Sequence, residues 1–214
     1  MPRPNLAQDA PPASISVGGA DYDINVDFRV WIDVLHELRN LYSAPETLEQ
    51  AISNAETIDR VETLVFGARI PQPAAEVLSA ILGFLEGYPE PPVGEGSAPS
   101  APVYSFEWDL NYILIAIQTQ FGIDLTYRRK EPFHWWLFLL YFHALAGDHY
   151  ILRLMEIRGY RGRDDDLKRQ AQRFALPREM SADDHAALDA FNALFDGGTT
   201  AADELTPAEE RKRN

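Results

Sequence analysis

The feature that most constrains the fold is an uncharged run over residues 135–142, WWLFLLYF, in which every side chain is aliphatic or aromatic. A helix that is apolar on every side is either a membrane span or the central helix of a packed domain. Pro132 suits a first helical turn, because its missing N–H would have no partner there. The predicted helix over residues 132–146 is ~22 Å long, which is short against the ~30 Å of bilayer hydrocarbon. We therefore expect a core helix.

A second helix precedes this run and should pack against it. Its apolar residues recur at steps of three and four, which places them on one helical face. Gly122 follows the last of them, as expected where a helix ends. These apolar residues are Phe106, Leu110, Ile113, Leu114, Ile117 and Phe121.

The N-terminal part carries the alternation of a short β-hairpin, interrupted by Gly18-Gly19. The alternating residues are Ile15 and Val17 before the glycines and Tyr22, Ile24 and Val26 after them. An isolated hairpin is barely stable in water, so it should lie on the helices or pair with another chain.

Further helices are predicted along the chain. Asp27 is a suitable N-cap for the first, because its carboxylate can accept from unpaired N–H groups of the first turn. Ser181 is expected to cap the last. The predicted segments are 28–41, a stretch opening at Ser43 and running through Ile52, 57–65 ending at Gly67, 73–85, 150–157, 163–174 and the final helix. The expected buried faces are Val77, Leu78, Ile81, Leu82 and Leu85 in one helix, and Ala187, Leu188, Phe191, Leu194 and Phe195 in the last.

These patterns predict a mainly α protein, a multi-helix bundle with a small N-terminal β-hairpin and a Pro-rich interlobe linker. Proline and glycine are dense in the linker, which cannot continue a helix. The expected organisation is a disordered tail (1–13), a hairpin plus helical N-terminal lobe (14–86), the linker (87–103), a helical core lobe (104–195) and a second disordered tail (196–214).

Charge and composition exclude several classes of function. The formal net charge of -14 repels a phosphate backbone, so we expect no nucleic-acid partner. The basic residues between Arg153 and Arg173 either offset the acidic excess on a solvated surface or form a docking surface for an acidic partner. The absence of cysteine excludes disulfides and thiolate metal sites. Residues 1–20 lack a secretory signal, and we expect no membrane partner.

No catalytic constellation stands out, so we expect neither an enzyme nor a cofactor. His143, Asp148 and His149 are close in sequence but lack the common helical spacing of metal ligands. Asp124 is expected to anchor its own loop through backbone N–H groups. Asp27 and Arg29 are expected to pair locally.

The sequence His134-Trp135-Trp136 allows two interpretations. The aromatic pair could anchor a partner, since tryptophan is enriched in binding hot spots. Alternatively, the histidine lies at the water boundary and hydrogen-bonds the Asp124 loop, which is the interpretation we favour. The two tryptophans point about 100° apart on a helix, so at least one should be buried.

Several of these residues carry a resemblance to a known family. The chain resembles the bacteriophage gp-fifteen-like family over residues 15–177, apart from the Pro-rich insert. The motifs are Asp27-Phe28-Arg29, Phe106 with Asp109, Phe121-Gly122-Ile123-Asp124-Leu125, His134-Trp135-Trp136 and Glu156-Ile157-Arg158. Members of that family are small tail-morphogenesis proteins encoded just before the tape-measure gene of long-tailed phages.

The resemblance implies a non-enzymatic tail-assembly chaperone that binds the phage tape-measure protein in the host cell cytoplasm and is absent from the mature virion. The tail tube protein is a further candidate partner, and self-association is expected through the hairpin edge and residues 153–173. The expected partner-binding residues are His134, Trp135, Trp136, Arg158, Arg161 and Arg163. The alternative is a structural virion component, a tail or head-tail connector subunit.

Overall fold

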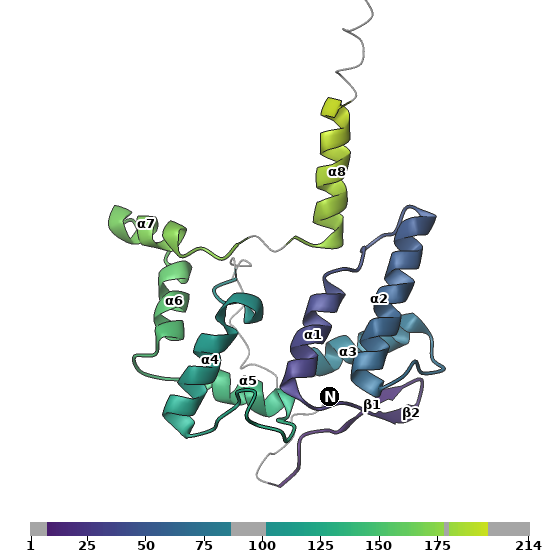
Figure 1. Ribbon diagram of the computed structural model, residues 1–214, viewed down its shortest axis with the longest axis horizontal. Coiled ribbons are helices and arrows are strands. Elements are labelled where there is room, and N and C mark those ends of the chain that lie inside the picture. The colour runs from purple at the N-terminus through teal and green to yellow at the C-terminus, as the bar shows by residue number, and fades with distance from the viewer. Residues whose placement is uncertain (1–7, 87–101, 178–179, 197–214) are drawn as a thin grey trace, which may run out of the picture.

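A computed structural model of the chain describes residues 8–86, 102–177 and 180–196. In these residues the chain forms one two-stranded hairpin and eight helices (Figure 1), which confirms the mainly α bundle with a small N-terminal hairpin. The elements are β1 (Ser14–Val17), β2 (Ala20–Asp23), α1 (Phe28–Leu38), α2 (Leu48–Phe66), α3 (Ala74–Leu85), α4 (Phe106–Phe121), α5 (Trp135–His143), α6 (Tyr150–Gly159), α7 (Asp165–Arg173) and α8 (Ala182–Asp196).

The hairpin lies against the helices rather than standing alone. Strands β1 and β2 pair antiparallel, with Ile15 opposite Tyr22. The turn uses Gly18 and Gly19, whose φ angles of 59° and 80° are costly for residues that carry a Cβ. Ile15 and Val17 are buried, and β1 packs on α3. The alternating pattern therefore identified the hairpin and the inward face of β1, whereas β2 ends at Asp23, before Ile24 and Val26 of the predicted alternation.

Helices α1 and α5 begin at one shared point. Asp27 caps α1 by accepting from the Arg29 N–H at 3.0 Å, and its carboxylate pairs with the Arg29 guanidinium at 2.9 Å, both as expected. The Phe28 N–H donates to the Phe133 carbonyl at 2.9 Å, and the Trp135 N–H donates to the Val26 carbonyl at 2.9 Å. These bonds pair Asp27 with His134 as an isolated antiparallel bridge.

This bridge corrects the predicted start of the apolar helix. The helix was expected over residues 132–146, but α5 spans Trp135–His143. Residues 133 and 134 must be extended to pair with the segment before α1, so helical geometry starts only after them. Pro132 lies in the extended approach, where a proline is equally well tolerated.

An aromatic cluster joins the two predicted lobes into one core. Phe28 of α1 stacks on Phe138 of α5, with ring centroids 4.5 Å apart. Phe84 of α3 lies between Trp31 of α1, at 4.3 Å, and Trp136 of α5, at 5.3 Å. The buried hydrophobic residues form one continuous cluster that includes residues from both sides of the Pro-rich linker. The lobes therefore share a core.

The tryptophan side chains of α5 also satisfy the end of α3. The Trp136 indole N–H donates to the Phe84 carbonyl at 2.9 Å, and that of Trp135 lies 3.4 Å from the Leu85 carbonyl. Carbonyl groups in the last turn of a helix have no partner within the helix, so an indole N–H is a suitable substitute. Both tryptophans are buried, whereas sequence required only one.

Two predicted helical segments are one continuous helix. We expected a segment from Ser43 to Ile52 and another over 57–65, but α2 runs from Leu48 without a break and ends at Gly67, as predicted. Thr47 and Gln50 form a reciprocal capping box at its start, which fixes the N-terminus four residues beyond Ser43. Nothing between the predicted segments breaks a helix, because the sequence there has neither glycine nor proline.

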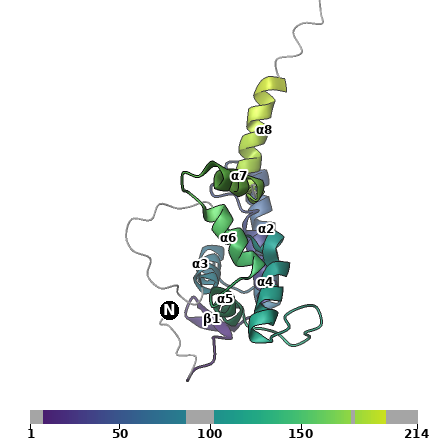
Figure 2. The ribbon, with the colours of Figure 1, turned by 90° about the vertical axis from the view of Figure 1, so that its left-hand side faces the viewer.

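The predicted faces of α3 and α8 need correction. Leu82 of α3 is exposed, and Phe84 takes its place in the core beside Val77 and Ile81. Helix α8 leaves the body of the molecule (Figure 2), so Ala187 and Leu188, expected to face inward, are exposed. The side chains of Phe191, Leu194 and Phe195 lie outside the described part of the chain. The predicted helix over 163–174 is confirmed as α7, capped by Asp164.

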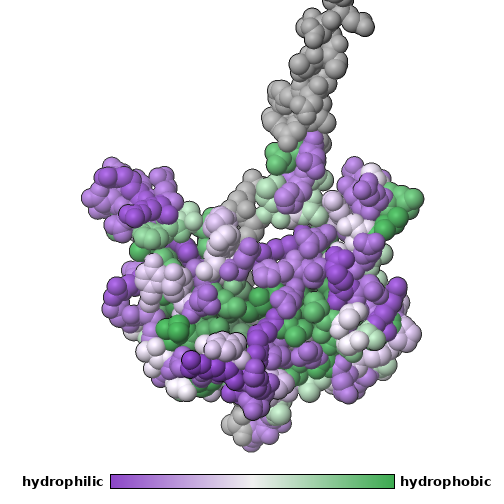
Figure 3. Space-filling view, viewed as in Figure 1, coloured by the Kyte–Doolittle hydropathy of each residue, from purple (hydrophilic) through white to green (hydrophobic). Residues whose placement is uncertain are grey.

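The expectations for the chain ends and linker concern mainly residues 1–7, 87–101 and 197–214, which lie outside the described residues. Within the described ranges, no helix combines the length and apolar character needed to cross a membrane. The face in Figure 3 is mostly polar around a central apolar region, with a further apolar patch at the start of α2. Leu48 and Ile52, both exposed, belong to that end of α2.

The double role of Trp136 gives a test of the shared core. Replacing Trp136 with Ala removes a side chain that is only 2% exposed, and we expect the free energy of unfolding to fall by about 3–5 kcal/mol. Urea denaturation followed by circular dichroism measures the change. Trp108→Ala is the matched control, because Trp108 is 52% exposed and should cost far less. Equal losses for the two variants would contradict the assignment.

Candidate functional site

The residues expected to anchor a partner lie inside the chain's own core. His134, Trp135 and Trp136 are each at most 9% exposed, so in this structure they offer no surface to a partner. We expected His134 to hydrogen-bond the Asp124 loop, but its partners lie elsewhere. Its Nδ1 accepts from the Trp136 N–H at 3.0 Å, which caps α5, and its Nε2 lies 2.9 Å from the Pro12 carbonyl. The ring therefore ties the N-terminal segment to α5.

The loop between α4 and α5 is held by other contacts. Asp124 accepts from the Thr126 N–H at 2.9 Å, so it anchors its own loop as predicted. The hydrogen bonds from Thr126 lower the pKa of the Asp124 carboxyl. The Arg29 guanidinium donates to the Arg129 carbonyl at 3.2 Å, which links this loop to the start of α1.

A buried ion pair joins α4 to α6. The Arg158 guanidinium contacts both carboxylate oxygens of Asp109, at 2.6 and 3.1 Å, and both side chains are less than a tenth exposed. Arg158 also donates to the carbonyls of Phe174 and Val103, at 2.8 and 3.1 Å. The Ser105 N–H donates to Asp109 at 3.0 Å. The pair thus holds together α6, the start of α4 and the chain after α7.

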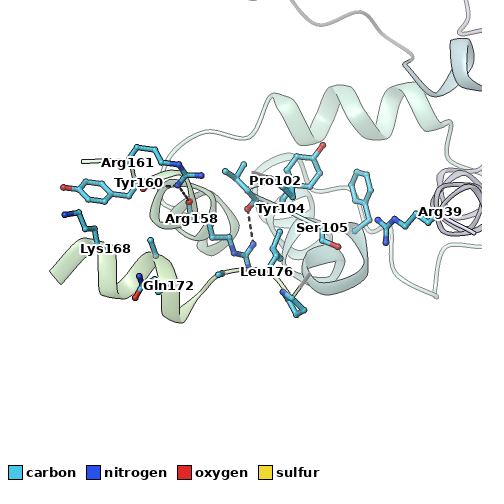
Figure 4. Close-up of a pocket in the computed structure, with 15 residues that line it drawn as sticks. Arg39, Pro102, Tyr104, Ser105, Arg158, Tyr160, Arg161, Lys168, Gln172 and Leu176 are labelled. Carbon is cyan, nitrogen blue, oxygen red and sulfur yellow. Dashed lines mark hydrogen bonds between the residues drawn. The ribbon is translucent and has the colours of Figure 1, made fainter. Parts of the chain in front are cut away.

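A pocket of about 880 Å³ lies next to this pair, between the start of α4, the end of α6 and α7 (Figure 4). Val103, Tyr104, Phe106 and Leu176 give it apolar walls. Figure 4 shows Arg161 and Lys168 on one side and Arg39 on the other. The fifteen lining residues include four cations and no acid. This pocket, called the basic pocket below, is a local positive site on a chain of net charge -14.

The predicted arginines therefore have three different environments. Arg158 is committed to Asp109, and it contributes to the wall of the basic pocket rather than to a free surface. Arg161 is exposed at the rim, where it donates to the carbonyls of Arg158 and Tyr160. Arg163 is exposed and lies outside the pocket. The structure brings Arg158 and Arg161 to one pocket, whereas the two tryptophans are buried in the core and do not line it.

A second surface was not anticipated from the sequence. Trp108, Tyr112 and Ile115 of α4 are 52%, 45% and 57% exposed. They follow one another at steps of four and three residues, so they form a stripe on the solvent side of the helix. Tyr150 of α6 extends it, with its ring centroid 4.8 Å from that of Tyr112. We call these four residues the aromatic stripe.

The sequence did contain a signal for this stripe. The inward face of α4 is already complete with residues such as Ile113 and Ile117, which are fully buried. Three further large apolar residues of the same helix, Trp108, Tyr112 and Ile115, fall on its opposite side. A surface helix needs only one apolar face, so the excess indicated a second partner for α4.

The described residues contain no group of three or more His, Asp or Glu side chains arranged to hold a metal ion. His149 instead lies 3.0 Å from the Gln120 amide oxygen, away from any ligand set.

The two polar junctions coincide with the sequence motifs. Asp27-Phe28-Arg29 meets His134-Trp135-Trp136 at the backbone bridge, and Asp109 meets Arg158 in the buried pair. A family model described as Bacteriophage Gp15 protein matches residues 7–179. The chain belongs to this family. It is therefore a bacteriophage protein.

The Gp15 match ends within the segment before α8, so helix α8 lies outside the matched region. The aromatic stripe and the basic pocket both lie inside the matched region. No curated protein and no solved structure matches the chain at a significant level.

Removing one partner of the buried pair should be costly, because the other charge would stay buried without compensation. We expect Arg158→Met to lower the free energy of unfolding by about 3–5 kcal/mol. Arg153→Met is the control, because it breaks an ion pair with Asp148 whose side chains are 58% and 74% exposed and should change stability little. Urea denaturation compares the two variants, and similar midpoints would refute a structural role for the Asp109–Arg158 pair.

Burial of His134 predicts a pH dependence of stability. Desolvation lowers the pKa of His134, because the charged ring is disfavoured in the core. The unfolded chain, with a histidine pKa of about 6.5, then binds the proton more readily than the folded chain. The folded state therefore keeps its full stability above about pH 6.5. It loses stability as the pH falls from there towards the lowered pKa of His134.

The measurement compares urea midpoints at neutral and mildly acidic pH for the wild-type protein and for His134→Asn. Asparagine can keep the capping acceptor but does not titrate. The wild type should lose more stability on acidification than the variant. Parallel losses would assign the pH dependence to other groups.

Proposed function

We propose that this phage protein is a non-enzymatic tail-assembly chaperone that binds a helix of the tape-measure protein through the aromatic stripe. The observation that carries the proposal is the stripe itself, an exposed apolar seam on a helix whose opposite face is already buried in the core. Family membership supplies the phage context. The proposed site of action is the host cell cytoplasm during tail assembly.

The spacing of the stripe suits a helical partner. Apolar side chains at steps of four and three form the seam with which one helix packs along another. A long helical tape-measure protein with an exposed apolar face would need that face covered until tail subunits assemble around it. An amphipathic helix laid on the stripe buries its apolar face in the same way as in other helix-binding proteins.

The charges around the stripe favour an apolar contact over a charge-directed one. Helix α4 contains two charged residues, Glu107 and Asp109, and Asp109 is buried in the pair with Arg158. Glu107 lies 3.6 Å from Arg39 of the same chain. Binding should therefore depend on burial of Trp108 and Tyr112 and only weakly on salt.

The test is co-expression with the tape-measure protein of the same phage, followed by co-purification and measurement of the partner's soluble fraction. We expect the wild type to keep the partner soluble, and Trp108→Glu and Tyr112→Glu each to weaken binding by about 2 kcal/mol or more. Leu48→Glu is the control, because Leu48 is 78% exposed and lies on α2, outside the stripe.

Two results would overturn the proposal. Co-purification that survives both stripe substitutions would place the contact elsewhere. Absence of co-purification, together with the protein in purified virions, would favour a structural component such as a tail or head-tail connector subunit.

A further inference from the structure

We infer that the basic pocket binds helix α8 of a second copy of this chain. This contact uses a different surface from the aromatic stripe, so it goes beyond the proposed tape-measure binding and does not depend on it. The inference rests on the position of α8, on its chemistry and on the charge of the pocket.

Helix α8 is anchored only at its first turn among the described contacts. The Ala182 N–H donates to the Arg39 carbonyl at 3.0 Å, and Asp183 accepts from the Ser43 N–H at 3.1 Å and from its hydroxyl at 2.6 Å. Beyond that turn the helix extends away from the body (Figures 1 and 2). Leu188 is 46% exposed. The helix is therefore presented to other molecules.

The sequence of α8 is both acidic and apolar. It contains four aspartates and no lysine or arginine. Among its described side chains, Leu188 is a large apolar residue at an exposed position. Helix α8 thus presents an exposed apolar side chain, that of Leu188, directly beside the exposed carboxylate of Asp189.

The basic pocket has the complementary composition. Its walls are apolar, and Arg39, Arg161 and Lys168 stand around them. Lys168 already lies 3.2 Å from Asp165 and Arg39 lies 3.6 Å from Glu107, but Arg161 has no ion pair among the described residues. A volume of about 880 Å³ is in the upper part of the range of about 300–1,000 Å³ typical of binding pockets. It can receive several apolar side chains.

A chain cannot readily place α8 in its own pocket. Arg39 contributes to the pocket and also holds the first turn of α8, so the helix begins beside the pocket and runs away from it. Folding back would break the contacts of Ala182 and Asp183. A second copy has no such constraint. The overall charge of -14 opposes self-association in general, but the pairing of acidic α8 with a basic pocket removes that penalty locally.

Such a contact is heterologous, because helix and pocket are different surfaces. Heterologous contacts produce rings or open chains of subunits, or close reciprocally between two copies. Each variant lacking one surface should therefore still bind a variant lacking the other.

The experiment is sedimentation velocity of the full-length protein over a range of concentrations, combined with mixing. Arg161→Glu with Lys168→Glu disables the pocket, and Leu188→Glu disables α8. Each variant alone should associate at least about tenfold more weakly than the wild type, and an equimolar mixture should form a one-to-one complex. Wild-type association should also weaken as salt is raised.

Tyr127→Glu is the control and should associate like the wild type, because Tyr127 is 78% exposed and lies on neither surface. Circular dichroism verifies that each variant is folded. A wild type that stays monomeric at all concentrations, variants that associate normally, or a mixture without a complex would overturn the inference. Trp108→Glu should keep self-association intact, which separates failure of this contact from failure of the proposed chaperone function.

Discussion

Two backbone hydrogen bonds, between residues 26–28 and 133–135, are the connection on which the rest of the structure depends. Asp27 and His134 are both N-caps, and an N-cap residue has extended backbone geometry before its helix begins. Two extended residues can pair as a short bridge, so α1 and α5 start side by side. Their aromatic residues then meet, with Phe28 on Phe138.

The Asp109–Arg158 pair has a comparable role on the other side of α4. A buried charge is tolerated only when it is paired and hydrogen-bonded, and here five hydrogen bonds converge on the two side chains. They bring the ends of α4, α6 and α7 close together, and the basic pocket lies among those ends. The geometry of the Asp109–Arg158 pair thus shapes a surface on which the two side chains are themselves hardly exposed.

Local signals were sufficient for some of the fold. The periodic face of α4 and the stop at Gly122 predicted that helix from Phe106 to Phe121, because its start and end depend on nearby residues alone. The start of α5 could not be found in this way, since it is set by pairing with Val26 and Phe28, far away in sequence. The predicted division of α2 into two segments was wrong because its apolar pattern is weak, and because the capping box of Thr47 and Gln50, not Ser43, sets its start.

Burial decided the site more than residue type did. Trp135 and Trp136 had the composition of a binding hot spot, but the indole groups turned inward to the end of α3. Trp108 is chemically the same residue, and it is exposed because α4 presents the opposite side to the core. Which face a helix buries is determined by its neighbours. Sequence alone could therefore show that α4 has more apolar residues than one face needs, but not which of its faces would be exposed.

The bridge between α1 and α5 also has a consequence for folding during synthesis. Ribosomes deliver the N-terminal part of a chain first, at about 5–20 residues per second. Phe28 of α1 and Phe84 of α3 emerge early, whereas Phe138, which stacks on Phe28, and Trp136, which stacks on Phe84, emerge only after α4. The nascent N-terminal half therefore has an incomplete aromatic core until α5 is synthesised. Helix α5, the last strongly apolar helix, then covers its apolar surface.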